Sequence, residues 1–390
     1  MDKENKNPVI RFKGFTEDWI QQELGEFLTE RKEMQKISED APILAFASGQ
    51  GVIDRSERKS NNRDHLTLDQ ENKVYKLTEF NDIVYNPSNL KYGAIDRNKH
   101  GRGVISPIYV TFTTEEEPSF MELIVKSEKF KLRALQYEEG TVVKRQSVKP
   151  ENLLSLKVEL SSSLDEQKQI GAYFQNLDNL IALQQKKHDQ LIILKKAMLV
   201  KMFPKKGALV PEIRFKGFTE DWEEDTLGKI ARITTGKSNR EDSDLEGEYT
   251  FFDRSEEIRR SDIYLFDCEA IIIAGEGSDF TPKYFNGKFD LHQRTYAIMN
   301  SKDIDGRFLQ YQIHLFRKYF LDQAVGSTVK SLRLPMFLNM SIKFPSKIEQ
   351  QKIGSYFQNL DNQIALHKTQ LDKLNNIKKA CFTKMFVAQD

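Results

Sequence analysis

Residues Glu166 to Phe203 read EQKQIGAYFQNLDNLIALQQKKHDQLIILKKAMLVKMF, and residues Glu349 to Phe386 return the same block as EQQKIGSYFQNLDNQIALHKTQLDKLNNIKKACFTKMF. A shorter block also occurs twice. Pro8 to Trp19 reads PVIRFKGFTEDW, and Pro211 to Trp222 reads PEIRFKGFTEDW, with a single difference. The sequence between these blocks does not visibly repeat. The chain is therefore a scaffold used twice that carries two different inserts.

The longer block predicts a helix with a coiled-coil seam. Its apolar residues are spaced alternately three and four apart, as at the a and d positions of a heptad. A capping-box pattern opens both copies, Ser163-Leu-Asp-Glu166 and Ser346-Lys-Ile-Glu349. Such a helix is roughly 50–57 Å long at 1.5 Å per residue. The predicted seam residues are Phe174, Leu177, Ile181, Leu191, Phe357, Leu360, Ile364, Leu371 and Leu374.

The simplest partner for one of these helices is the other copy, because a long helix with an exposed apolar stripe is not stable alone. We therefore predict an antiparallel coiled-coil pair. The alternative is that each helix packs only on its own domain. Polar residues also fall on the seam, where they would weaken the pairing and fix its register; they are Gln184, His188, Lys195, His367 and Lys378.

The two inserts read as mixtures of strands and helices. Strand-like stretches occur at 82–85, 104–112, 270–274 and 294–299, and helical stretches at 120–137 and 308–324. Each helical stretch precedes a similar segment, 140–144 or 326–330. We predict an α+β protein in which two α/β domains of one fold are joined by the two helices in a pseudo-twofold repeat. The predicted boundaries are 1–160 (first domain), 161–204 (first helix), 205–345 (second domain) and 346–390 (second helix).

Composition narrows the class of protein. The 390 residues leave room for two or three domains, and the net charge of +1 argues against a uniformly basic coat. Only two cysteines occur, which suggests a reducing compartment. The first residues do not resemble a signal peptide, and no apolar run is long enough to span a bilayer. A cytoplasmic protein is the expectation.

The first insert holds a stretch suited to DNA, in which aromatic, amide and basic residues alternate between glycines. Amides can read adenine and arginine can read guanine, while lysine holds phosphate. The alternative is an ordinary solvated surface. The candidates are Tyr85, Asn86, Ser88, Asn89, Lys91, Tyr92, Arg97, Lys99 and Arg102, followed by a second cluster of Lys144, Arg145 and Gln146. The acidic run 115–117 is expected to face away from DNA.

The second insert has its own candidates, which differ from those of the first. They combine basic residues with amides in four short clusters. The same alternative, a solvated surface, applies to them. The candidates are Lys237, Asn239, Arg240, Arg254, Arg259, Arg260, Lys283, His292, Gln293, Arg294, Lys330 and Arg333.

Catalytic motifs are weak in this chain. Asn86-Pro87-Ser88-Asn89 lacks the second proline and the aromatic residue of an amino-methyltransferase turn, and Gly275-Glu-Gly277 is an isolated GxG. Glu71-Asn-Lys73 after Asp54 fits a nuclease motif only loosely. Thr235-Gly-Lys-Ser238 lacks the first glycine of a phosphate loop. Neither His188 nor His367 has a metal-ligand spacing to a second histidine or cysteine, and no metal site is expected.

The order of domain, helix, domain and helix, the repeated EQxxIGxYFQNLDNxIAL and the opening RFKGFTEDW resemble the specificity subunits of Type I restriction–modification systems. The resemblance covers nearly the whole chain. It implies a non-catalytic subunit with two target-recognition domains, each reading one half of a bipartite double-stranded DNA site. It also implies that the helices set the gap and dock two modification subunits, which methylate adenine at N6, and that two restriction subunits complete the complex.

The resemblance further implies that this chain binds no cofactor, and that S-adenosylmethionine, ATP and Mg²⁺ belong to the partner subunits. We therefore expect a DNA-sequence specificity subunit with two unlike half-sites and a fixed gap. Half-sites about 34–36 Å apart, one turn of DNA, would suit the spacer. The bases are not predicted. The alternatives are a structural coiled-coil adaptor, which would have no evident need for two different inserts, and a catalytic DNA-modifying enzyme.

Overall fold

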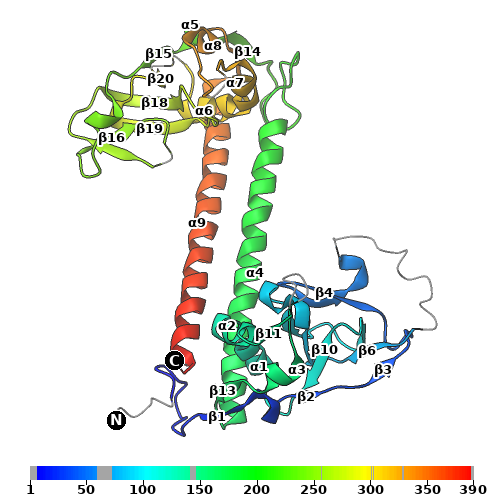
Figure 1. Cartoon of the computed structure of the whole chain (residues 1–390). Coiled ribbons are helices and arrows are strands. Elements are labelled where there is room, and N and C mark those ends of the chain that lie inside the picture. Colours follow the sequence, from blue (N-terminus) through cyan, green and yellow to red (C-terminus); the bar gives the residue numbers. More distant parts are fainter. Residues whose placement is uncertain are drawn as a thin grey trace. The chain divides into compact units, whose positions relative to one another are not determined.

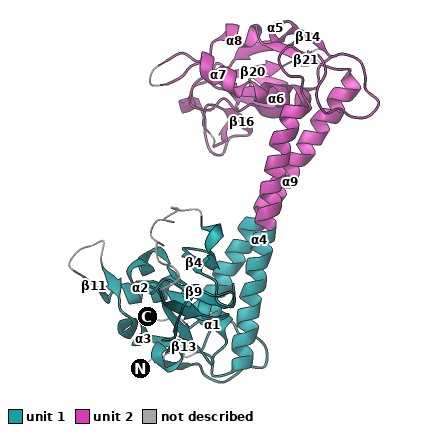
Figure 2. Ribbon diagram, turned by 90° about the vertical axis from the view of Figure 1, so that its right-hand side faces the viewer, with its two compact units in different colours: residues 1–183, 371–390 teal, residues 184–370 magenta. Residues whose placement is uncertain are grey.

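The computed structural model describes residues 7–58, 73–140, 146–255, 257–299, 301, 303–326 and 329–387. It divides into two compact units, residues 1–183 with 371–390 and residues 184–370 (Figure 2). Each unit holds one insert and parts of both long helices, α4 (Leu164–Lys201) and α9 (Lys347–Met385) (Figure 1). The end of α9 thus groups with the first insert. The domain boundaries predicted from the sequence remain predictions.

The first unit is built on a four-stranded antiparallel sheet and several smaller ladders. The main sheet has the order β2 (Thr29–Glu30), β10 (Val110–Thr113), β7 (Ile83–Tyr85), β8 (Ile95–Arg97). The smaller ladders are β3 (Met34–Gln35), β6 (Tyr75–Thr78) and β9 (Gly103–Ile105); β4 (Leu44–Ala47) and β5 (Gly51–Asp54); β1 (Ile20–Glu23) and β13 (Lys157–Leu160); β11 (Glu138–Glu139) and β12 (Ser147–Val148). The helices are α1 (Pro118–Val125), α2 (Glu128–Leu135) and α3 (Pro150–Leu154), with short 3-10 turns η1 (Leu24–Glu26), η2 (Arg55–Glu57) and η4 (Pro87–Tyr92).

The second unit has a larger, six-stranded sheet. Its order is β15 (Arg232–Thr235), β20 (Thr295–Met299), β18 (Phe266–Ala274), β19 (Lys283–Leu291), β16 (Tyr249–Phe252), β17 (Arg259–Ser261). A separate ladder pairs β14 (Glu223–Thr226) with β21 (Ser341–Phe344). The helices are α5 (Leu227–Ile230), α6 (Gly306–Leu315), α7 (Arg317–Gln323) and α8 (Leu334–Leu338), with the 3-10 turn η6 (Arg240–Asp242).

The two inserts share one fold, as the sequence predicted. The order β2-β10-β7-β8 in the first unit recurs as β15-β20-β18-β19 in the second, and every one of these pairs is antiparallel. The ladder of β1 and β13 likewise recurs as β14 and β21. Two helices follow the sheet in both units. A loop at a given place in one unit therefore has a structural counterpart in the other.

Some predicted elements are divided in the structure. The stretch 104–112 forms two strands, because a turn closed by the Tyr109 N–H and the Ser106 carbonyl (3.0 Å) separates β9 from β10. The helical stretch 120–137 is two helices, since Ser127 caps a new helix by accepting from the Phe130 N–H. The stretch 308–324 is divided at Phe316, where α6 ends and α7 begins without a side-chain cap. These breaks are set by caps and turns, which hydrophobic spacing does not reveal.

The predicted antiparallel helix pair is confirmed within each unit. In the first unit the start of α4 packs on the end of α9, where the rings of Phe174 and Phe382 lie 5.8 Å apart. In the second unit the end of α4 packs on the start of α9, and Lys195 forms an ion pair with Asp361. The predicted seam residues are buried or half-buried along both helices: Phe174, Leu177, Ile181, Leu191, Phe357, Leu360, Ile364, Leu371 and Leu374.

The two repeated blocks form one structural piece in each unit. The guanidinium of Arg11 donates twice to the buried Glu166 carboxylate (2.8 Å each), and Arg214 donates twice to Glu349 (2.7 Å each). Burial alone would raise the pKa of Glu166, but the hydrogen bonds and charge of Arg11, together with hydrogen bonds from Ser161 and Trp19, outweigh burial and lower it. The RFKGF motif is therefore an anchor for the first turn of the long helix, which explains why the two blocks are duplicated together.

The Gln and Gly of the EQxxIG motif attach the insert to the long helix. Gln167 accepts from the Glu117 N–H (3.0 Å) at the start of α1, and Gln350 accepts from the Asp305 N–H (2.7 Å) at the start of α6. A Cβ on Gly171 would lie 2.0 Å from the Ser119 hydroxyl oxygen, so only glycine permits this close approach. The duplicated motif thus holds α1 and α6 against their long helices.

The last residues of each long block complete a core. In the first unit Phe386 packs edge-on against Trp19, with ring centroids 5.9 Å apart. In the second unit Phe203 packs against Trp222 in the same way, at 6.0 Å.

Within the described residues, no helix combines the length and the hydropathy needed to cross a lipid bilayer.

Candidate nucleic-acid interfaces

A short 3-10 turn presents the main candidates of the first unit. The Asn86 side chain accepts from the Ser88 N–H (3.0 Å) and caps η4, and Pro87 supplies a fixed φ at its first position. Gly93 ends the turn with a φ of 74°, a left-handed conformation that favours glycine. The turn leaves Ser88, Asn89 and Tyr92 exposed, which suits contacts to a nucleic acid.

A second segment lies against this turn. Residues of β12 contact η4, and the buried Tyr85 hydroxyl donates to the Val148 carbonyl (3.1 Å). Lys91, on η4, lies with its Nζ 3.7 Å from a carboxylate oxygen of Glu138 on β11. Gln146 immediately precedes β12 and is half-buried. The structure therefore brings the two predicted clusters of the first insert together, although Lys144 and Arg145 lie outside the described residues.

Three candidates of the first unit have interior positions. Tyr85 is fully buried, and burial raises the pKa of its phenol. Asn86 is 3% exposed and Arg97 is 7% exposed. Arg97 donates from Nε to Glu122 (3.0 Å) and from Nη1 to Asn81 (2.7 Å), and the exposed Lys99 also donates to Glu122 (2.5 Å). The polar atoms of Tyr85 and Arg97 thus bond within the domain, and direct contact of these residues with DNA stays a prediction.

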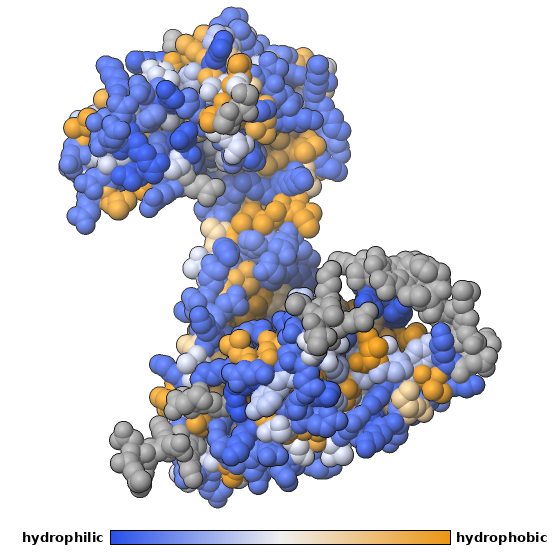
Figure 3. All heavy atoms as spheres, in the orientation of Figure 1, coloured by the Kyte–Doolittle hydropathy of each residue, from blue (hydrophilic) through white to orange (hydrophobic). Residues whose placement is uncertain are grey.

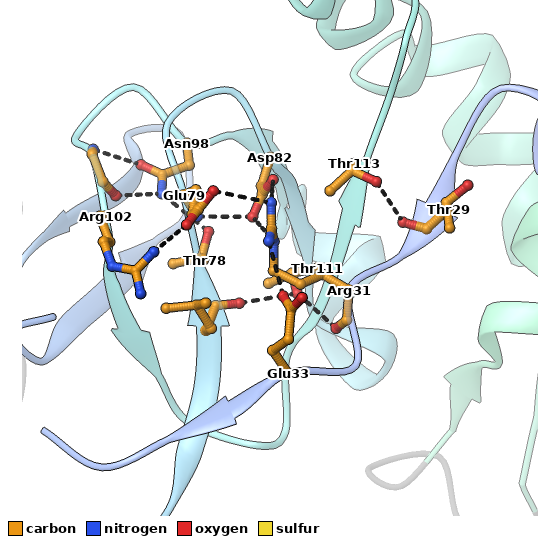
Figure 4. Close-up of polar contacts among 12 residues, drawn as sticks. Thr29, Arg31, Glu33, Thr78, Glu79, Asp82, Asn98, Arg102, Thr111 and Thr113 are labelled. Carbon is orange, nitrogen blue, oxygen red and sulfur yellow. Dashed lines mark hydrogen bonds and ion pairs between the residues drawn. The ribbon is translucent and has the colours of Figure 1, made fainter.

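Arg102 belongs to a network of acidic and basic side chains drawn in Figure 4. It is exposed, but its guanidinium donates to Glu79, and a second nitrogen donates to Gln35 (3.2 Å). In the same network Arg31 donates to Asp82 (2.8 and 3.1 Å). Burial raises the pKa of Asp82 against the opposing effect of Arg31. A phosphate would have to compete with Glu79 for Arg102.

The second unit gathers its candidates around Glu276. This residue lies in the loop after β18, and its carboxylate accepts from Arg294 Nη1 (2.9 and 3.1 Å). Arg254, from the loop after β16, lies 4.0 Å from the same carboxylate. The Gly277 N–H donates to the Lys330 carbonyl (2.9 Å), so the segment before α8 also lies here. Two loops thus place arginine side chains beside one acidic residue, and a third segment packs against the same loop through its backbone.

Amide side chains lie beside this group. Gln293 donates to the Asn239 side chain (2.5 Å), and its backbone N–H donates to the Ser238 carbonyl (2.9 Å). Arg240, at the start of η6, lies 3.5 Å from Asp253. Lys237 is exposed on the same loop. The turn before η6 and the loop between β19 and β20 therefore present amides and cations side by side.

Other candidates of the second unit bond to their own domain. Arg259 donates to the Ser243 hydroxyl (2.6 Å) and carbonyl, and Arg260 donates to the Gly247 carbonyl (2.8 Å) and to the Glu248 carbonyl. Lys283 donates to the Ser255 carbonyl (3.1 Å), and Lys330 to the Leu321 carbonyl (2.7 Å). Burial lowers the pKa of His292, which accepts from the Arg294 N–H (3.1 Å). Arg333 is exposed.

The candidates of both units occupy corresponding places in the shared fold. In the first unit the loop after β7 meets the segment before α3; in the second the loop after β18 meets the segment before α8. The side chains differ, with amides and an aromatic residue in the first and arginines in the second. Sequence reasoning did not single out Glu79, Glu122 and Glu276, because their pairing with cations depends on contacts distant in sequence.

Comparison with known proteins finds similarity to Type I restriction specificity proteins. Residues 219–376 match the family model described as Type I restriction modification DNA specificity domain. The chain is 31% identical over 159 residues to the Type I restriction enzyme EcoDI specificity subunit of Escherichia coli. It is 26% identical over 182 residues to the MjaVIII specificity subunit of Methanocaldococcus jannaschii. These matches cover 41% and 43% of this chain, and only 35% and 42% of the two relatives.

A solved structure supports the fold over the full length. The Type I restriction–modification S subunit from M. genitalium aligns with a TM-score of 0.61 at 17% identity, covering 98% of this chain and 100% of that chain. The resemblance to the specificity subunits of Type I restriction–modification systems is therefore confirmed. The similarity to the DNA specificity domain of that family lies in residues 219–376.

Proposed function

We propose that this chain is a DNA specificity subunit of a Type I restriction–modification complex, and that it is not itself catalytic. One observation carries the proposal. Two inserts of the same topology present unlike side chains at corresponding loops, while the blocks that support them recur in both halves of the chain. Such an arrangement suits a protein in which two domains of the same fold recognise two different DNA sequences. Each insert would read one half of a bipartite site.

Binding would combine phosphate contacts with base readout. Exposed Arg254 and Arg294 in the second unit can hold phosphate or read guanine, while Asn239 and Gln293 can read adenine. In the first unit Ser88 and Asn89 would have the corresponding role. Because Glu276 neutralises two arginines, DNA must replace it as their partner. This competition accounts for an interface in a chain with a net charge of only +1.

The paired helices would set the distance between half-sites. Their heptad seam is continuous through both copies, and ion pairs between the helices recur at equivalent positions. A rigid pair would fix the gap, with half-sites about one DNA turn, 34–36 Å, apart.

The outer faces of the helices would dock partner subunits. Leu183, Ile193 and Val200 are exposed on α4, and Figure 3 shows hydrophobic surface on the helical part of the molecule. Exposed apolar side chains in such number are typical of protein–protein contacts. The partners would be two modification and two restriction subunits, which would bind S-adenosylmethionine, ATP and Mg²⁺.

The proposal is tested by purifying the chain with its partner subunits and mapping methylated adenines in the host genome. The expected result is a two-part motif with a fixed gap. Exchanging residues 20–160 for the corresponding insert of another specificity subunit should change one half of the motif and leave the other half and the gap intact. A continuous motif, or a change in both halves, would contradict the proposal.

A further inference from the structure

The first unit contains a cavity of about 690 Å³ beside η4. Its walls come from the hairpin of β4 and β5, the turn η4 and the residue Tyr109 before β10. The volume lies within the range of small-molecule sites in proteins, about 300–1,000 Å³. Two of the lining residues, Asn86 and Asn89, were candidates from the sequence; Phe46, Gln50 and Tyr109 were not.

One wall of the cavity is flat and aromatic. The rings of Phe46 and Tyr109 are stacked, with centroids 5.6 Å apart and planes inclined by 29°. Both side chains are buried, and Ile53 and Ala94 add apolar surface beside them. An aromatic wall of this kind suits a planar ligand, because rings gain from stacking as well as from burial.

The polar residues that line the cavity are the amides Gln50, Asn86 and Asn89, together with Ser48, Glu57 and Arg58. Asn86 is 97% buried, and its Oδ1 accepts from the Ser88 N–H, whereas no described residue accepts from its Nδ2. This nitrogen is not enclosed by protein atoms, so it can donate to a ligand atom that enters the cavity. The side chains of Asn89 and Gln50 also line the cavity. Donors and acceptors therefore lie at the edge of a planar apolar space.

We propose that this cavity binds a nucleobase, stacked on the wall of Phe46 and Tyr109 and hydrogen-bonded to the amides of Asn86, Asn89 and Gln50. The inference rests on the proposed function, since the base would be one base of the first half-site turned out of the duplex. The exposed Arg58 at the rim would meet the phosphate beside that base. Stacking on the aromatic wall would offset part of the unstacking cost.

The test uses the assembled complex and duplexes that carry its motif. Each base pair of the first half-site is replaced in turn by a mismatch, which lowers the cost of turning a base out. At one position the mismatch should tighten binding several-fold. Ala47→Trp, which fills the cavity, should abolish that gain, and Gln50→Ala should reduce it. Gln175→Ala, an exposed glutamine on α4, is the matched control.

Circular dichroism and retained binding of the second half-site show that the Ala47→Trp variant is folded. A parallel titration with free deoxynucleoside monophosphates distinguishes the source of the base. If a free nucleotide binds saturably, Ala47→Trp removes that binding, and no mismatch effect is seen, the cavity is a base-binding site for a free nucleotide. Motif-specific DNA binding with neither a mismatch effect nor nucleotide binding overturns the inference. Loss of motif-specific binding by the unaltered complex would instead refute the proposed function.

Discussion

Gln184 and His367 form a hydrogen-bonded pair, with Oε1 and Nδ1 2.6 Å apart, although each is the nineteenth residue of its own copy of the long block. The two helices therefore meet at equivalent positions. The ion pairs obey the same rule, since Lys195 with Asp361 and Lys378 with Asp178 are the same contact with the copies exchanged. The antiparallel register is thus specified by polar contacts on the seam, as the sequence suggested.

The Gln184–His367 contact can be tested by exchanging its partners. Replacing His367 with Leu leaves a half-buried amide without its partner and should cost about 1 kcal/mol of unfolding free energy. The double exchange Gln184→His with His367→Gln restores the contact and should stay within about 0.5 kcal/mol of the unaltered protein. Denaturant unfolding measures both. Equal losses in the two variants would show that the contact does not matter.

The arginine anchors of the two units should be of similar importance. Replacing Arg11 with Ala leaves the Glu166 carboxylate buried without its partner, which should destabilise the first unit by about 3 kcal/mol. Arg214→Ala should do the same to the second unit through Glu349. Hydrogen exchange resolves the two units separately. Protection lost in both units from either single variant would argue against independent anchors.

Acid should weaken the first unit through Glu122. Burial would raise the pKa of this carboxyl, but Lys99, Lys126 and Arg97 outweigh burial and lower its pKa from 4.5 to about 2. A lowered folded-state pKa stabilises the protein above the ordinary value, and this contribution is lost as the pH falls from 4.5 towards 2. Glu122→Gln should therefore be less stable at neutral pH and lose less on acidification.

The measurement is unfolding free energy at pH 7, 5, 4 and 3 for both proteins. The neighbouring Asp96 remains in the variant, and its pKa is raised by burial, so it contributes with the opposite sign. The Glu122 charge also raises the Asp96 pKa, so Glu122→Gln lowers that pKa and the difference between the two profiles reports both carboxyls. Parallel pH profiles would exclude Glu122 as the acid-sensitive group.

DNA affinity should respond to Glu276 and Arg294 in opposite directions. Glu276→Gln frees two arginines from an internal carboxylate and should tighten binding and steepen its salt dependence. Arg294→Ala should weaken binding and reduce the salt slope by about 0.9 if the guanidinium holds one phosphate. Lys91→Ala makes the same test in the first unit. Asp279→Asn, an exposed acidic residue in the same loop as Glu276, is the matched control.

Lengthening both helices should lengthen the gap in the DNA motif. Seven residues inserted after Leu183 and seven after its counterpart Leu366 keep the heptad seam in register and add roughly 10 Å at 1.5 Å per residue. The methylated motif should gain about three base pairs in its gap at 3.4 Å each, with unchanged half-sites. The same insertion after Leu183 alone should destabilise the helix pair. An unaltered gap in the protein with both insertions would contradict the spacer role of the helices.

The sequence predicted the helices and their seam because heptad spacing is a local signal that every turn repeats. It also predicted that the inserts share a fold, since strands and helices follow in the same order. The burial and the pairing of individual side chains were not predictable from the sequence. The sequence suggested that Arg97 and Arg102 are available to DNA. Both are instead paired with carboxylates, Glu122 and Glu79, which lie more than twenty residues away in the sequence. The cavity escaped notice because Phe46, Asn86 and Tyr109 come from three separate segments.

The packing of Phe386 against Trp19 determines when the first unit can complete its core during synthesis. Met385 is buried in the first unit's core and Phe386 packs against Trp19, so that unit includes residues that are translated after the whole of the second unit. The second unit is continuous, from 184 to 370, and all its parts emerge earlier. The unit whose first residues are translated earlier is therefore completed after the other, and part of its core stays uncovered until the end of α9 has been synthesised.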